Sequence, residues 1–151
     1  MSDLRKLEDW AGALLVKIEP KERRRINQTI ARELRRSQQQ RIKAQRNPDG
    51  SAYVPRKKTP KRTKSGKIKQ KAMFHKMAQA TRLRMNSTAD AVGIAFMSRT
   101  ARIARVHQYG LSESPGGKSP RVKYDKRELL GFTDSDIEMI KDRLIDYLGD
   151  L

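Results

Sequence analysis

The chain holds two histidines, and neither has the neighbours that catalysis requires. His107 lies in the stretch ARIARVHQYG, where a general base would need a reacting group and an orienting partner. The chain has no cysteine, so thiol catalysis and zinc–thiolate sites are excluded. His75, in the run MFHKM, is equally isolated, and two histidines without an acidic cluster make a poor metal site. We therefore expect His107 to be a packed residue that closes a helix, and we expect no cofactor and no metal.

The stretch GGKS, residues 116–119, resembles part of a phosphate-binding P-loop. That motif needs a glycine five residues before its second glycine, and the chain has Ser112 there. It must also open a helix, whereas Pro120 and an expected strand follow. The stretch therefore predicts the tip of a polar loop over 111–120.

The strongest chemical signal is positive charge. The 151 residues carry a formal net charge of +18, and residues 41–71 hold twelve bases against one acid, Asp49. Apart from Tyr53 at its edge, this stretch has no aromatic residue to stack on bases, which favours contact with a duplex backbone or with an acidic protein surface. The candidate DNA or subunit contacts are Arg56, Lys57, Lys58, Lys61, Arg62, Lys64, Lys67, Lys69 and Lys71.

The end of the chain has the opposite charge, since residues 134–150 hold six acids against two bases. The N-terminus lacks the profile of a signal peptide, and no apolar run approaches membrane-spanning length. We expect synthesis in the cytoplasm and no membrane partner. The length favours one domain over 1–151, and the modest apolar content favours a small core with polar arms or one completed by neighbouring subunits.

Three regions are expected within that domain: a helical N-terminal region over 1–46, a basic loop arm over 47–71, and a sheet with a closing helix over 72–151. In the first region, apolar residues three and four apart predict a helix over 4–18. Pro20 suits the start of a second helix that reaches about Gln45, with a narrow apolar stripe. NPDG, residues 47–50, signals a turn, and prolines and charge predict a mobile loop over 55–68.

In the third region the spacing of apolar residues predicts a short helix over 72–80 and then an antiparallel hairpin with strands near 83–85 and 92–97. A helix over 101–109 should end at Gly110, and a short strand is expected at 122–124. Thr133 and Asp136 have the spacing of a capping box before the closing helix. One face of that helix carries Ile137, Ile140, Leu144 and Leu148.

Four stretches, taken together and in order, resemble a known family. They are LRKLEDWAGALL, RSQQQRIKAQRNPDGSAYVPRK, RIARVHQYGL and RELLGFTDSDIEMI, and they span nearly the whole chain. This combination is similar to the tail completion, or virion morphogenesis, proteins of contractile-tailed temperate phages. Each stretch alone would be a weak signal, whereas the combination is specific.

The resemblance implies an α+β fold with several helices on a small antiparallel sheet, assembled as a ring. It implies a non-enzymatic protein that completes the tail end and takes part in joining the tail to the DNA-filled head at the neck. The expected partners are other copies of the chain (a hexamer, or alternatively a dodecamer), other neck and tail proteins, and genomic DNA in the lumen. The expected location is the virion, after assembly in the host cytoplasm. The residues expected to be structural are Tyr53, His107, Tyr109, Gly110 and Phe132.

Two other functions stay open on the residues alone. The chain could be a stand-alone, sequence-nonspecific nucleic-acid-binding protein that works through the basic arm, and a hydrolase using His107 is the remaining catalytic alternative. The location of the arm distinguishes a stand-alone nucleic-acid-binding protein from a ring protein, because in a ring the arm should lie in the lumen or at a subunit contact.

Overall fold

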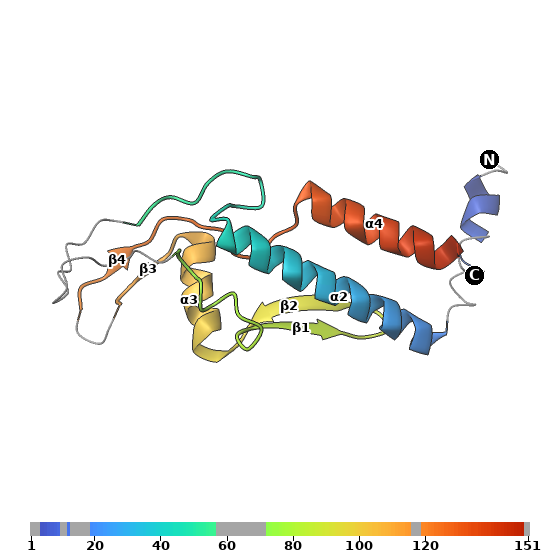
Figure 1. The fold of residues 1–151 in the computed structure, drawn as a ribbon, viewed down its shortest axis with the longest axis horizontal. Coiled ribbons are helices and arrows are strands. Elements are labelled where there is room, and N and C mark those ends of the chain that lie inside the picture. Colours follow the sequence, from blue (N-terminus) through green and yellow to red (C-terminus); the bar gives the residue numbers. More distant parts are fainter. Residues whose placement is uncertain (1–3, 10–11, 13–18, 57–71, 116–118, 150–151) are drawn as a thin grey trace.

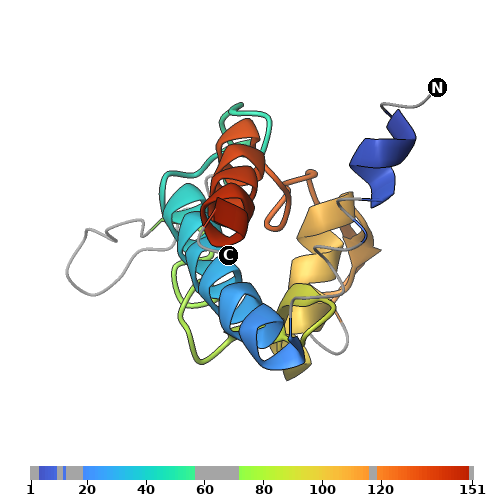
Figure 2. The same ribbon diagram turned by 90° about the vertical axis from the view of Figure 1, so that its right-hand side faces the viewer.

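The computed structural model describes residues 4–9, 12, 19–56, 72–115 and 119–149. Within these residues the fold is α+β, with a long helix between a β-hairpin and a second helix (Figure 1). The long helix, α2 (Pro20–Lys43), packs across strands β1 (Leu83–Ser87) and β2 (Val92–Phe96) and also against the closing helix α4 (Asp134–Gly149). In the turned view, α4 lies beside α2, while α3 (Ser98–Tyr109) stands apart from α4 on the other side of the molecule (Figure 2).

The helix α2 forms as its sequence predicts. Pro20 occupies its first turn, where the missing N–H costs little, and the helix ends at Lys43 instead of near Gln45. Gln45 has a positive φ of 58°, which a helix cannot continue. The buried side of α2 is wider than the predicted stripe, since it adds Gln38, Arg41 and Ile42 to the expected apolar residues.

The predicted hairpin is confirmed. β1 and β2 pair antiparallel, with Leu83 opposite Phe96 and Met85 opposite Ile94 on the bulky face. Gly93 and Ala95 lie on the other face, so the alternation of large and small side chains separates the two faces as expected. Leu83 is fully buried in the core. That core joins the hairpin to α2, α3 and the segment before α4, and its members are Ile42, Tyr53, Met73, Met77, Ala78, Leu83, Phe96, Ala104 and Leu129.

The helix expected over 72–80 is wrong. Residues 73–82 form successive turns and bends, although Met73, Met77 and Ala78 are buried as an apolar pattern predicts. Phe74 has a positive φ of 66°, which interrupts any α-helix at that point. The apolar pattern therefore identified core residues correctly, although a series of turns, and not a helix, places their side chains in the core.

The elements around α3 and α4 follow their end signals. Gly110 closes α3 in the left-handed conformation, with φ of 61°, as its position predicted. A small second hairpin follows, in which β3 (Ser112–Glu113) pairs with β4 (Val122–Lys123). β4 confirms the expected strand, whereas β3 falls inside a segment expected to be loop. The capping box is confirmed too, since the backbone N–H of Asp136 donates to Thr133 Oγ1 and that of Thr133 to Asp136 Oδ2, both at 3.0 Å.

Candidate functional site

The segment just before α4 is held almost entirely by side chains. We call residues 127–131 the strap, because they cross from the second hairpin to the start of α4 without regular secondary structure. Backbone groups that are buried need partners, and a strand or helix would normally supply them. Here the partners are five polar side chains from three separate parts of the sequence, which we call the clamp: Gln38, Arg41, Asn47, Tyr53 and Gln108.

Arg41 is the centre of the clamp. Its guanidinium donates to the carbonyls of Glu128 (3.0 Å) and Leu129 (2.7 Å), and it also donates to Gln38 Oε1 at 2.5 Å. The side chain is buried, although Arg41 is the first of the twelve bases counted over 41–71. The charge of Arg41 is therefore used inside the subunit, where several oxygens accept hydrogen bonds from its Nη groups.

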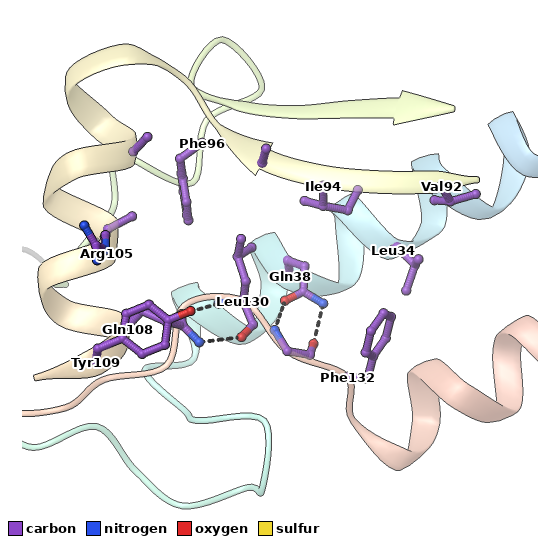
Figure 3. Close-up of a pocket in the computed structure, with 14 residues that line it drawn as sticks. Leu34, Gln38, Val92, Ile94, Phe96, Arg105, Gln108, Tyr109, Leu130 and Phe132 are labelled. Carbon is purple, nitrogen blue, oxygen red and sulfur yellow. Dashed lines mark hydrogen bonds between the residues drawn. The ribbon is translucent and has the colours of Figure 1, made fainter. Parts of the chain in front are cut away.

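The two glutamines hold the strap with both ends of their amides (Figure 3). Gln108 Oε1 accepts from the N–H groups of Leu129 (2.8 Å) and Leu130 (3.0 Å), while its Nε2 donates to the Leu130 carbonyl at 2.8 Å. Gln38 Nε2 donates to the Gly131 carbonyl at 2.8 Å, and its Oε1 accepts from the Gly131 N–H at 3.2 Å. An amide that pairs with backbone in this way imitates a neighbouring strand.

The NPDG turn supplies the remaining clamp contacts. Asn47 Oδ1 accepts from the Glu128 N–H at 2.9 Å, and Tyr53 Oη donates to the Glu128 carbonyl at 2.8 Å. Pro48 packs so closely on Gly131 that a Cβ at Gly131 would overlap the proline ring. The turn, the end of α2 and the strap therefore form one interlocked unit.

An apolar groove of about 610 Å³ lies next to the strap, between α2, β2 and α3. Leu34, Ile94 and Leu130 line it, and its two glutamines, Gln38 and Gln108, are already committed to the strap. Tyr109 and Phe132 stand on either side of Leu130 (Figure 3). Among the described residues that line it, the groove therefore offers an apolar surface with one cation, Arg105, in its wall.

Tyr109 and Phe132 are both 64% exposed. Tyr109 was expected to be structural, but in the single subunit its side chain lies at the rim of the groove and not in the core. Tyr53, in contrast, is 4% exposed and belongs to the core. Two large aromatic side chains left in solvent beside an apolar groove are typical of a surface that another molecule covers.

His107 lies in the last turn of α3 with its ring between Phe74 and Tyr124, at centroid distances of 4.8 and 5.0 Å. Burial, and then the charges of Arg127 and Arg56, lower the pKa of His107 from 6.5 to about 4. The ring is therefore neutral at pH 7, and Nδ1 has no hydrogen-bond partner among the described residues. No serine or threonine is among the described residues lining its cavity, so the described residues form no Ser–His or Thr–His pair there.

The comparisons with known proteins agree with one another. The profile of the phage virion morphogenesis family matches residues 2–149. Tail completion protein S of Escherichia phage P2 is 36% identical over 149 residues, which cover 98% of this chain and 99% of that protein. The chain belongs to the phage virion morphogenesis family. No solved structure matches it significantly.

For this member of the virion morphogenesis family, the structure explains why the four stretches were informative only in combination. Three of them supply the clamp and the strap: Gln38 to Tyr53 come from the second, Gln108 from the third, and the strap opens the fourth. The sequence did not identify Gln38, Gln108 or Asn47 as a site. The available signal was that polar residues interrupt the buried side of α2, which is unusual for a packed helix.

Of the candidate basic contacts, Arg56 is described and exposed, beside the cavity that holds His107. The others, Lys57 to Lys71, lie outside the described residues, as do Gly116 to Lys118. In the part of the chain that the structure describes, no three acidic or histidine side chains gather as a metal site would need. None of the helices placed there is both long and apolar enough to cross a bilayer.

Proposed function

We propose that this chain is a structural virion protein that completes the tail end and takes part in joining the tail to the DNA-filled head at the neck. The observation that carries the proposal is the end-to-end similarity to a protein named tail completion protein S, at 36% identity over 98% of the chain. A match that covers both proteins almost entirely supports transfer of the role and not merely of a shared domain.

The structure supports an assembly role over a catalytic one. The polar side chains of the clamp are used in contacts with the backbone of the strap, and the groove beside the strap is mainly apolar, with Tyr109 and Phe132 exposed at it. Enzyme pockets combine apolar walls with convergent polar groups that remain available to a substrate. In the groove, the glutamines already have their partners.

The proposal includes a homo-oligomeric ring, a hexamer or alternatively a dodecamer, in contact with other neck and tail proteins. The opposite charges of the middle and the end of the chain support it, because a ring brings different faces of neighbouring copies together. The lumen of such a ring would place basic residues next to the genome. The chain would act in the virion after assembly in the host cytoplasm.

Deletion of the gene in a phage that encodes this chain tests the role. We expect normal numbers of DNA-filled heads and separate tails, few joined particles, and restored joining when the wild-type chain is supplied from a plasmid. Electron microscopy of the lysate counts the three classes. Joined, infectious particles at wild-type levels without the chain would disprove the proposal, and a neck reconstruction with a single asymmetric copy would disprove the ring.

A further inference from the structure

The start of the chain carries an apolar stripe that the subunit leaves uncovered. We call residues 4–18 the N-terminal segment. Residues 4–9 are helical, as predicted, and Leu4 and Leu7 on this helix are 71% and 62% exposed. The sequence continues their stripe at four positions that lie outside the described residues: Ala11, Leu14, Leu15 and Ile18. A helix of this length is marginal in water by itself, so the stripe needs a surface to pack on.

The charged residue that borders this stripe is an acid. Glu8 follows Leu4 by four positions and precedes Leu15 by seven, so helical periodicity places it beside the stripe, about 70° from its centre. The other charged residues of the N-terminal segment lie about 110° or more from that centre on the same helix. They are Arg5, Lys6, Asp9 and Lys17.

The groove beside the strap has the matching features. Its floor is apolar, and the exposed rings of Tyr109 and Phe132 stand on either side of it (Figure 3). Arg105 lines it and has no ion-pair partner among the described residues. Amphipathic helices bind other proteins by laying their apolar side in such a groove. Groove and stripe therefore match in apolar character and in charge.

The outer side of α4 is the competing surface for this stripe, because Ile137, Leu144 and Leu148 are exposed there. The cation beside them, Lys141, is already paired with Glu138. The side of a single helix is also convex, so it surrounds a second helix less than a groove does. The groove is therefore the better match for the N-terminal segment.

The N-terminal segment does not cover the groove of its own copy. Residues 4–9 lie beyond the first turn of α2, whereas α3 lies toward the other end of that helix (Figure 1). Only Glu19, which is extended, separates the predicted helix over 4–18 from Pro20. Two antiparallel helices are joined by about 2–5 residues, so this connection is too short for the segment to fold back along α2. A neighbouring copy must therefore supply the segment.

We propose that the N-terminal segment of one copy of this chain docks in the groove between Tyr109 and Phe132 of the next copy, with Glu8 facing Arg105. This inference rests on the proposed ring and names its contact. The occupant is a second copy because every chain carries both surfaces and leaves both uncovered. The contact joins two different surfaces, so it is head-to-tail, and such a contact closes into a ring or continues as a filament.

The absence of cysteine in the chain allows a direct test by thiol crosslinking. The variant Leu7→Cys/Ala101→Cys has one thiol on the stripe and one in the groove, and both positions are exposed in the subunit. Tails that contain it are treated with a short bismaleimide, run on a denaturing gel and probed with an antibody to the chain. We expect a ladder of dimers, trimers and larger species, since each copy is linked to the next. Either single variant should give only monomer.

Two matched controls move one thiol at a time. Asp9→Cys replaces Leu7→Cys and lies two residues along the same helix, about 160° round it from Leu7. Ile103→Cys replaces Ala101→Cys, because Ile103 is exposed on α3 and is not among the residues that line the groove. Each control double variant should give far less of the ladder.

A charge exchange provides the second measurement, independent of any thiol. Glu8→Arg alone and Arg105→Glu alone should each lower incorporation into tails, because each puts like charges at a contact that the ring repeats. The double variant Glu8→Arg/Arg105→Glu should recover incorporation, since it restores opposite charges at every contact. Asp9→Arg, on the other side of the helix, is the control and should be incorporated like the wild type.

Four outcomes would overturn the contact. A crosslinked monomer without a ladder would mean that the segment covers the groove of its own copy. A ladder from Leu7→Cys/Leu144→Cys but not from Leu7→Cys/Ala101→Cys would assign the segment to α4. Equal ladders from the controls, or normal incorporation of both single charge variants, would mean that stripe and groove do not meet. In each case the wild-type chain is still found in tails by immunoblot, whereas failure of the proposed function would leave tails without it.

Discussion

Arg41 and Tyr53 donate to the same backbone oxygen. Arg41 Nη1 lies 3.0 Å and Tyr53 Oη 2.8 Å from the carbonyl oxygen of Glu128, and the two donors are 3.4 Å from each other. One comes from the last turns of α2 and the other from the segment after the NPDG turn. The end of α2 and the segment after the turn are thus both fixed to a strap carbonyl that is 75 or more residues away in sequence, which orients the strap and the helix α4 that follows it.

Replacing Arg41 should disrupt the clamp and lower the stability of the fold. Arg41→Met keeps much of the length of the side chain but leaves the carbonyls of Leu129 and Arg46 without their side-chain donor, while the Glu128 carbonyl keeps its bond from Tyr53. Each buried polar group that loses its partner costs about 1–3 kcal/mol, so we expect the free energy of unfolding to fall by roughly 2–6 kcal/mol. Urea denaturation followed by circular dichroism measures the change.

Arg36→Met is the control for this prediction, because Arg36 lies on the same helix and is exposed. It should change the free energy of unfolding by less than about 0.5 kcal/mol. Equal effects of the two substitutions would mean that the clamp contributes nothing beyond the charge of the helix.

Gly131→Ala should disturb the strap from its other end. A Cβ there overlaps the ring of Pro48, so the NPDG turn must move and the Asn47–Glu128 hydrogen bond must lengthen. Overpacking of this kind costs about 1–3 kcal/mol. Gly93→Ala is the matched control, since a Cβ at Gly93 meets only the Asn86 carbonyl, at 3.9 Å.

A double-mutant cycle tests whether the overlap with Pro48 causes the loss of stability in Gly131→Ala. Pro48→Ala removes the ring, so Gly131→Ala should cost less stability in that background than in the wild type. Thermal unfolding of the four proteins supplies the coupling free energy. Additive losses would indicate that Gly131 acts through its own backbone conformation.

His107 should make stability depend on pH. Its pKa in the folded chain, about 4, is below the unfolded value of about 6.5, so the folded state prefers the neutral ring. Stability from this residue is complete above pH 6.5 and is lost as the pH falls toward 4, because the unfolded chain binds the proton first. The ring is partly exposed and screened by solvent, so we expect a loss on the order of 1–2 kcal/mol, below what the full shift would give.

His107→Gln should remove this dependence while keeping the fold and most of the assembly activity. Urea titrations at pH 7 and pH 4.5 compare it with the wild type and with His75→Gln, whose parent residue is exposed. A His107→Gln protein that folds and enters tails normally, yet yields no infectious phage, would favour a chemical role for the ring.

The parts of the fold that the sequence predicted are those set by local rules. The hairpin follows from alternation of large and small residues, the end of α3 from Gly110, and the start of α4 from Thr133 and Asp136. Each of these depends on contacts between residues close in the chain, so the pattern contains nearly all the information.

The clamp could not be predicted in the same way, because it depends on side chains that meet across long separations. Gln38 and Gly131 are 93 positions apart, and Arg41 and Leu129 are 88 apart. From composition alone, an arginine in a basic stretch is expected to be exposed to solvent, and only the fold shows that Arg41 is buried. Tyr109 is the opposite case, since it was expected to be structural and its side chain is exposed in the single subunit.

The basic arm yields the last prediction, which separates DNA from protein as its partner. Replacing Lys57, Lys58, Lys61 and Arg62 by Gln removes four charges from a stretch expected to contact a polyanion. If the partner is duplex DNA, binding should be insensitive to sequence, and its dependence on salt should weaken in the variant. The slope of log K against log salt should become shallower by about 0.9 for each phosphate that the variant no longer neutralises. Fluorescence anisotropy with two unrelated duplexes, over a range of salt, measures the slope.

The matched control replaces four exposed arginines of α2 by Gln, which lowers net charge equally and leaves the arm intact: Arg24, Arg25, Arg32 and Arg36. If the arm instead contacts a neighbouring subunit or a tail protein, the arm variant should enter tails poorly while its DNA binding stays near that of the control. An arm variant unchanged in both salt slope and tail assembly would show that these charges have neither partner.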